Sequence, residues 1–225
     1  MRNLLLALTC LGVALGSARG GAVEVPDLDD PKVQYELGMS HLTSQGGAKK
    51  DPVEAVTWLR KAALQGHADA QVQLGICYQQ GFGIVRDLVQ ALGWFRRAAE
   101  QGNARGQLQV GLAYQRGRGV APDSGQAMVY LRKAAESRHP KAQLELGVAY
   151  REGRGVEADP VAAAFWLRLA ADSGSLAANM MSAGARKALS DAQRADLDER
   201  LASWRRKHPA PAPESDSSSA APSDS

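Results

Sequence analysis

The fold is decided by residues 74–102, LGICYQQGFGIVRDLVQALGWFRRAAEQG, because this pattern returns along the chain with a period of 36 residues. In each copy an acidic residue is followed after seven positions by an aromatic, and after four more by an Ala-Ala pair. These pairs stand at residues 62–63, 98–99, 134–135 and 170–171. Self-similarity at a fixed period of this length is the signature of a solenoid of stacked units. Solenoids mostly act through extended binding surfaces, so the sequence predicts a binding protein rather than a catalyst.

Each unit is expected to be a pair of helices. In the clearest copy, Ala70, Leu74 and Tyr78 recur at the spacing of four that marks one face of a helix. Gly81 ends this helix, since glycine tolerates the left-handed conformation of a C-cap. Asp87 begins a second helix, and Gln90 three residues later completes a capping box. The same device is expected for Asp51 with Glu54 and for Asp123 with Gln126.

Small residues within these helices predict close packing. Gly75, Gly111 and Gly147 each lie inside a first helix, where glycine costs about 1 kcal/mol relative to alanine. That cost is reasonable only if another backbone approaches closely, and the Ala-Ala pairs of the second helices are the expected counterparts. We therefore predict an all-α fold, an α-solenoid in which antiparallel helix pairs stack into a right-handed superhelix.

The repeat resembles the Sel1-like repeat, a relative of the tetratricopeptide repeat. The resemblance is carried by Leu74-Gly75-x-x-Tyr78-x-x-Gly81-x-Gly83, followed by the acid, the aromatic and the Ala-Ala pair. Equivalent motifs begin at residues 110 and 146, and the resemblance covers residues 32–176. It implies that the first helices line a concave face and that the protein works by binding other proteins.

The two ends of the chain depart from the repeat. Residues 4–15 form a short apolar run after Arg2, and small residues follow, as in a secretory signal peptide at 1–22 cleaved after Ala18 or Ala22. The run is shorter than the roughly 20 residues of a membrane span, and the residues before Cys10 fit a lipoprotein signal poorly. Atypical terminal units close a solenoid. We expect the solenoid at 30–188, a capping helix at 189–207 and a disordered tail at 208–225.

No group of residues in the sequence points to catalysis. The histidines His41, His67, His139 and His208 are scattered, and His67 and His139 occupy equivalent turns where they suit helix N-caps. No histidine pair has the spacing of a helical zinc site, and no serine is followed by a lysine three residues later. We therefore expect no enzyme activity, no metal and no cofactor. Cys77 lies among apolar residues and is expected to be a buried thiol.

The charge balance narrows the class of partner. Removing the predicted signal peptide, with Arg2 and Arg19, leaves 25 basic and 24 acidic residues, a net charge of +1. Such near-neutrality argues against a nucleic-acid partner, and no later segment is long and apolar enough to span a membrane. The predicted signal peptide indicates an exported protein, and the Ala- and Arg-rich composition together with the resemblance to the Sel1-like family implies the periplasm of a Gram-negative bacterium. The resemblance also implies a protein as its partner.

The candidate partner-binding residues lie on the first helix of each unit, at four offsets from the Leu-Gly pair. The apolar candidates are Tyr35, Val72, Leu108 and Leu144, with Met39, Ile76, Leu112 and Val148 one turn later. The polar candidates are Lys32, Asp69, Arg105 and Lys141 on one side, and Gln79, Gln115 and Arg151 on the other. The basic members suit an acidic or carboxylate-bearing partner segment. Two alternatives remain: the apolar rows are buried between helices, or the partner binds the arginines of loops 116–119 and 151–155.

The resemblance suggests three functions. The first is binding of a protein partner in the concave face. Its sharper form is an immunity protein, since small periplasmic Sel1-like proteins neutralise antibacterial lipase-type toxins. The second is an adaptor for cell-envelope assembly, in secretion or polysaccharide export. The third is binding or hydrolysis of cell-wall material. Sel1-like proteins linked to β-lactam binding carry regular cysteine pairs, and this chain lacks them, which argues against the third function.

Overall fold

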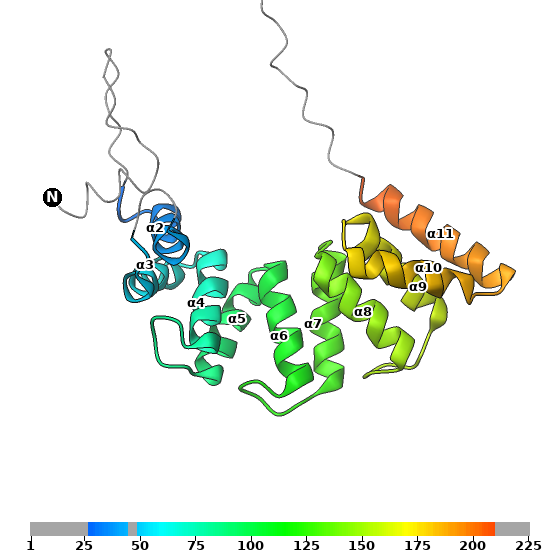
Figure 1. Ribbon diagram of the computed structural model, residues 1–225, viewed down its shortest axis with the longest axis horizontal. Coiled ribbons are helices and arrows are strands. Elements are labelled where there is room, and N and C mark those ends of the chain that lie inside the picture. Colours follow the sequence, from blue (N-terminus) through cyan, green and yellow to red (C-terminus); the bar gives the residue numbers. More distant parts are fainter. Residues whose placement is uncertain (1–26, 45–48, 210–225) are drawn as a thin grey trace, which may run out of the picture.

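The computed structural model describes residues 27–44 and 49–209, and all regular secondary structure within these ranges is helical. The helices are α2 (Pro31–Thr43), α3 (Pro52–Leu64), α4 (Ala68–Gln80), α5 (Leu88–Glu100), α6 (Ala104–Arg116), α7 (Ser124–Glu136), α8 (Pro140–Glu152), α9 (Pro160–Asp172), α10 (Leu176–Lys187) and α11 (Asp191–Lys207). Consecutive helices from α2 to α10 pack against each other, and α11 packs on α9. The predicted all-α solenoid is confirmed, and its helices form an arc (Figure 1).

The arc has two different edges. Figure 1 shows the short turns between α5 and α6 and between α7 and α8 on its inside, and the longer loops after α6 and α8 on its outside. We call inner rim the first turn of α2 and the turns 65–67, 101–103, 137–139 and 173–175 with the first turn of the helix that follows each. We call outer rim the Gly-x-Gly loops 81–87, 117–123 and 153–159. The two ends of each first helix therefore belong to different rims.

The second helix of each unit begins at an aspartate held by two sets of hydrogen bonds. The Asp87 carboxylate accepts from the N–H groups of Val89 at 2.9 Å and Gln90 at 3.0 Å. The Asp87 N–H itself donates to the carbonyl oxygen of Tyr78 at 2.9 Å, across the loop. The predicted capping box is wrong in its second half, because this N–H already has a partner and is not left for the Gln90 side chain. The same bond across the loop recurs at Asp51, Asp123 and Asp159.

The glycine inside each first helix lets the second helix approach closely. A Cβ atom on Gly75 would lie 2.5 Å from the Phe95 ring and 3.1 Å from the carbonyl oxygen of Ala91. The equivalent contacts are Gly38 with Leu59, Gly111 with Leu131 and Gly147 with Leu167. The counterpart is thus a bulky residue three positions before the Ala-Ala pair, and not the pair itself as the sequence suggested. Alanines of the pairs are buried in the core instead, and Ala98 lies against Gly106 of the next unit.

The C-terminal end is closed by aromatic packing. Helix α11 follows Ser190, which forms a capping box with Gln193. Its residues Leu197 and Leu201 are buried. The Trp204 ring packs edge-on against Trp166 of α9, with ring centroids 5.6 Å apart. Helix α11 thereby covers the exposed side of α9 at the C-terminal end of the arc (Figure 1).

Several sequence predictions fall on residues that the structure does not describe. The predicted signal peptide with its two cleavage sites and residues 210–225 of the predicted tail lie outside the described residues, as do residues 45–48. Among the helices that are described, none has the length and apolar character needed to cross a membrane.

Replacing Gly75 with alanine should lower the free energy of unfolding by about 2 kcal/mol, because the new methyl group overpacks the contact with the Phe95 ring. Gly93→Ala is the matched control, since Gly93 lies exposed on α5 and a Cβ there meets nothing within 4 Å. It should raise the free energy of unfolding by about 0.5–1 kcal/mol through helix propensity. Urea unfolding followed by circular dichroism measures both, and equal effects would contradict a close approach at Gly75.

Candidate functional site

The apolar candidates divide into buried and accessible residues. Val72, Leu108 and Leu112 are buried in the packing between helices, so they cannot contact a partner and leave the candidate set. The other apolar candidates keep part of their surface in solvent: Tyr35, Met39, Ile76, Leu144 and Val148. Tyr35 is already stacked on His67, with ring centroids 4.8 Å apart. The alternative that the apolar rows are buried between helices is therefore correct for three of these eight residues.

The first set of polar candidates lies on the inner rim. Lys32, Arg105 and Lys141 are exposed, whereas Asp69 is half-buried. The Asp69 carboxylate accepts a hydrogen bond from the Asn103 side-chain amide at 2.9 Å, so the acid of this row is used internally. Within the described residues, no acidic side chain forms an ion pair with the three cations. The inner rim therefore presents positive charge that is free to meet an acidic partner.

The charges of two of these cations act on His139. Burial lowers the pKa of His139, and the charges of Arg105 and Lys141 lower it further. The predicted N-cap role is confirmed for His67, whose Nδ1 accepts from the Ala70 N–H at 3.2 Å, but it is wrong for His139. The buried His139 Nδ1 makes no hydrogen bond to any described residue, and the ring lies near the two cations instead. A neutral imidazole next to two cations leaves the positive charge of this patch on Arg105 and Lys141.

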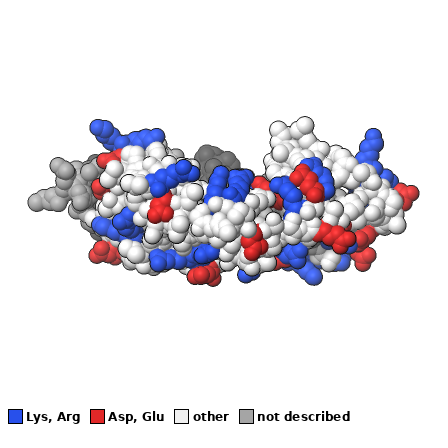
Figure 2. Space-filling model, turned by 90° about the horizontal axis from the view of Figure 1, so that it is seen from below, with Lys and Arg blue, Asp and Glu red and all other residues white. Residues whose placement is uncertain are grey.

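The second set of polar candidates lies at the other end of the same helices, beside the outer rim. Arg151 is ten residues from Lys141 along α8, which corresponds to about 15 Å of helix. Arg151 and Arg154 both pair with Glu152, at 2.9 Å each, and the hydrogen bond from Arg151 lowers the pKa of that carboxyl. Figure 2, which views this outer side, shows basic and acidic side chains interspersed. The structure thus separates Gln79, Gln115 and Arg151 from the inner-rim cations and does not gather the polar candidates at one point.

A ladder of buried glutamines on the inner rim was missed by the sequence reasoning. Gln34, Gln71, Gln107 and Gln143 occupy equivalent positions and are buried. The Nε2 atoms of the last three donate to the carbonyl oxygens of Ala63, Ala99 and Ala135 in the preceding unit. These bonds link unit to unit. The signal was present in the sequence, because a glutamine recurs at this position at the period of the repeat.

A second missed link joins the units through arginine and tyrosine. The Arg60 guanidinium donates to the Tyr78 hydroxyl at 3.1 Å, and Arg96 donates to the Tyr114 hydroxyl at 2.9 Å. Arg132 bonds Tyr150 in the same way. An arginine two residues after each aromatic of the repeat is the sequence signal that could have predicted these pairs. Both missed links are structural and leave the exposed inner-rim cations as the candidate site.

The part of the chain described by the structure contains no group of three or more His, Cys, Asp or Glu residues that could hold a metal ion. Its cysteine, Cys77, is free and buried on α4. Burial raises the pKa of the Cys77 thiol to about 11. Such a thiol stays protonated at physiological pH and is a poor nucleophile.

Cys77 should therefore react slowly with a thiol reagent in the folded protein. At pH 8, a pKa of about 11 leaves the thiolate fraction more than a hundredfold below that of an ordinary cysteine. The measurement is the rate of colour release from Ellman's reagent by the chain from Val23, which lacks Cys10. The same protein in denaturant should react at the rate of a free thiol. Fast labelling of the native protein would show that α4 opens or that the thiol is not buried.

The chain is similar in sequence and structure to proteins of one family. A sequence model described as the Sel1 repeat matches residues 31–67, 68–103, 104–139 and 140–175. The crystal structure of a Sel1 repeat protein from Oxalobacter formigenes shares 33% identity and a TM-score of 0.66, over 80% of this chain and 73% of that one. No curated protein sequence matches the chain.

A second solved structure is that of c5321, a protective antigen of uropathogenic Escherichia coli strains with an SLR fold. It shares 28% identity and a TM-score of 0.74 with this chain, over 90% of this chain and 44% of its own length. The present chain therefore spans less than half of that antigen. Proteins built from Sel1 repeats are generally non-catalytic modules of protein–protein interaction. Four matched repeats, each coinciding with one helix pair, show that the chain belongs to the Sel1 repeat family.

Proposed function

We propose that this protein is an exported binding module that holds an acidic segment of a protein partner on its inner rim. The observation that carries the proposal is the set of exposed cations Lys32, Arg105 and Lys141, which have no acidic partner among the described residues. These cations occupy equivalent positions of the first, third and fourth units, and the second unit has Asp69 at this position. A row of cations at repeat spacing suits an extended chain with several carboxylates.

The outer rim is the weaker candidate surface for the same function. Arg151 and Arg154 pair with Glu152, whereas Arg116 and Arg118 form no ion pair with a described residue. Basic and acidic side chains are interspersed over this face (Figure 2). A solvated charged edge accounts for that pattern. The outer rim also provides the best control, because an equal number of charges can be reversed there without touching the inner rim.

An Arg105→Glu/Lys141→Glu variant should lose at least tenfold in affinity for the partner captured from an envelope extract, because two attractive contacts become repulsive. The bait is the chain from Val23, and affinity is measured by biolayer interferometry once mass spectrometry has identified the captured protein. Arg116→Glu/Arg118→Glu carries the same charge change on the outer side and should bind within about twofold of the unchanged protein. Retained binding by the first variant with loss in the second would move the site to the outer rim.

The finer form of the proposal is that the partner is an antibacterial phospholipase-type toxin and the protein its periplasmic immunity protein. It rests on the resemblance to small exported Sel1-like proteins with that role. Co-expression of the full chain with a secreted phospholipase encoded by a neighbouring gene should restore growth of cells that the enzyme alone kills. The Arg105→Glu/Lys141→Glu variant should fail to do so. Killing that continues despite periplasmic delivery of the unchanged protein would remove the immunity role and leave an envelope-assembly adaptor as the finer form.

A further inference from the structure

The glutamine ladder of the inner rim is complete in the first two units and broken in the last two. In the first unit the Gln65 side-chain amide donates to Gln34 Oε1 at 2.9 Å. In the second unit the Gln101 amide donates to Gln71 Oε1 at 2.8 Å. Serine stands at the equivalent positions 137 and 173. As a result, the buried Oε1 atoms of Gln107 and Gln143 accept no hydrogen bond from any described residue.

The break at Ser173 coincides with a pocket. A pocket of about 360 Å³ lies between α8, α9 and α11, and Gln143, Leu169, Ser173 and Trp204 are part of its lining. Gln143 is only 2% exposed, so its unpaired acceptor is held within the fold and is not hydrated as a surface amide would be. The short Ser173 side chain donates to the carbonyl oxygen of Leu169 and does not pair with Gln143 as Gln101 pairs with Gln71. The pocket therefore lies beside the break in the ladder, and the Gln143 Oε1 atom is itself covered.

Arg138 on the wall of the same pocket is held in a strained backbone conformation. Its φ is +62°, in the left-handed region, where the equivalent residues Gly66, Gly102 and Gly174 are glycines. A side chain at such a position is disfavoured and persists only where the surroundings enforce it, which happens often at binding sites. The Arg138 guanidinium lines the pocket and donates to the carbonyl oxygen of Pro209 at 3.3 Å. It is thus placed to donate to a neutral peptide or amide carbonyl.

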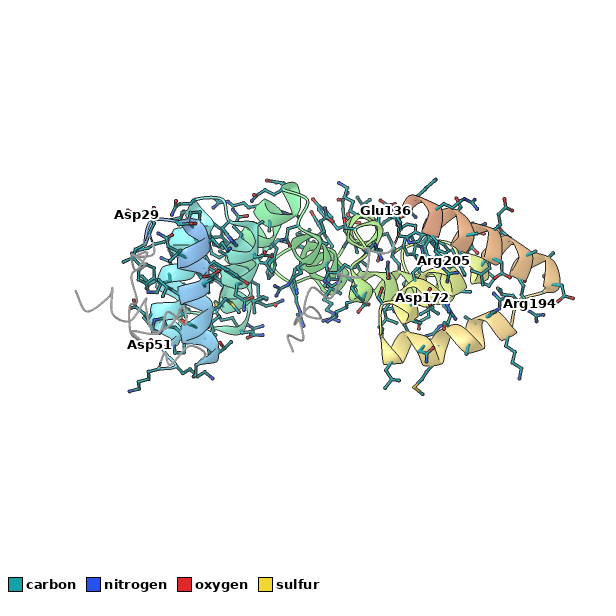
Figure 3. The ribbon with its side chains drawn as sticks, turned by 90° about the horizontal axis from the view of Figure 1, so that it is seen from above. Asp29, Asp51, Glu136, Asp172, Arg194 and Arg205 are labelled. Atoms are coloured by element: carbon teal, nitrogen blue, oxygen red, sulfur yellow. The ribbon has the colours of Figure 1, made fainter. Side chains whose placement is uncertain are left out.

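The pocket lining contains one ion pair and one further cation, Arg138. Asp172 pairs with Arg168 at 2.8 Å and with Arg205 at 2.9 Å, and Figure 3 shows Asp172 and Arg205 meeting between α9 and α11. Arg138 has no acidic partner among the described residues, so the choice between a neutral and an anionic ligand rests on the unpaired acceptor of Gln143. What it offers is an acceptor at Gln143, a donor at Arg138 and an apolar wall at Leu169 and Trp204.

We propose that this pocket binds the carboxamide side chain of a glutamine or asparagine presented by the protein partner. The inference rests on the proposed function of the inner rim as a protein-binding surface. The carboxamide N–H₂ donates to Gln143 Oε1 as the Gln101 amide does to Gln71, and its carbonyl accepts from Arg138. A carboxylate fits poorly, because it has no hydrogen to donate and its charge meets the Gln143 oxygen. The ligand completes the ladder that the chain leaves open.

The test uses blocked amino acids as probes and two serine variants. The purified ¹⁵N-labelled protein is titrated by NMR with N-acetylglutamine amide, and in parallel with N-acetylglutamate amide. The Trp204 indole N–H and the Ser173 amide should shift progressively with the glutamine probe, with at least tenfold weaker response to the glutamate probe. Ser173→Gln should abolish the response, because the new side chain fills the pocket and pairs Gln143. Ser137→Gln is the matched control, since it repairs the ladder one unit away and should leave the response unchanged.

Thermal unfolding supplies a readout that is independent of any ligand. Ser173→Gln and Ser137→Gln should each raise Tm, because each pairs one buried acceptor. Arg138→Gly, which relieves the strained backbone and removes the donor, should also raise Tm while weakening the response to the glutamine probe severalfold. A lower Tm for Ser173→Gln would contradict the inference that Gln143 lacks a donor because residue 173 is a serine.

Three further results would overturn the carboxamide site: no response to the glutamine probe at 50 mM, an equal response to both probes, or a response that persists in Ser173→Gln. The proposed function is tested separately by the Arg105→Glu/Lys141→Glu capture, in which Arg138 and Ser173 are unchanged. Partner binding with no probe response would reject the pocket alone. A probe response without any captured partner would support the pocket and reject the acidic-segment proposal.

Discussion

The fold depends on one close contact in every unit, where the second helix lies against the glycine of the first. At Gly75 the Phe95 ring and the Ala91 carbonyl fill the place of a side chain, and a leucine does so in the other three units. Because this contact fixes the distance between two helices, it also constrains which residues fit at the other positions of the repeat pattern. With the two helices at this distance, the Asp87 N–H reaches the Tyr78 carbonyl across the loop, and the Arg60 side chain reaches the Tyr78 hydroxyl of the next unit.

A scaffold repeated so closely confines variation to a few places, and the inner rim is one of them. Position 101 can change from glutamine to serine in later units without disturbing the helix contact, because it lies in the turn after the second helix. The same holds for the exposed residue that is Lys32 in the first unit and Lys141 in the last. The rim can therefore differ from unit to unit while the arc stays the same, which is how solenoids acquire distinct partners on a common frame.

The sequence predicted the parts of the structure that recur and missed those that depend on side-chain direction. The helix pairs, the C-caps at Gly81 and its equivalents, and the N-caps at Asp87 and Asp123 follow from local pattern, since these residues act within their own turn. The burial of Leu108 and Leu112 could not be read from helical spacing alone. Both lie on a face that also contains accessible residues, and only the packing of neighbouring units decides between them.

The same limit explains the errors at the candidate site. Residues Lys141 and Arg151 share one helix, so spacing suggested one surface, whereas the fold places them at opposite rims. The role of His139 was inferred from its equivalence to His67. Equivalence of position fixed the backbone, but the neighbouring cations of this unit, Arg105 and Lys141, changed the surroundings of the ring. The repeat pattern predicts the backbone structure of each unit, whereas the environment of a side chain depends on the residues around it in that unit.

The defects of this chain are not spread evenly over its repeats. The first two units satisfy their buried glutamines, whereas the last two leave Gln107 and Gln143 without a donor, at about 1–3 kcal/mol for each unpaired buried group. The strained residue of the inner-rim turns, Arg138, lies in the same half. Random loss of stabilising contacts would weaken the outer rim and the helix contacts equally, yet the close glycine contacts are kept in all four units. Two of these features, the unpaired Gln143 acceptor and the strained Arg138, belong to residues that line one pocket, whereas Gln107 lies one unit away. Departures from local rules on a scaffold that is otherwise complete are expected at functional sites.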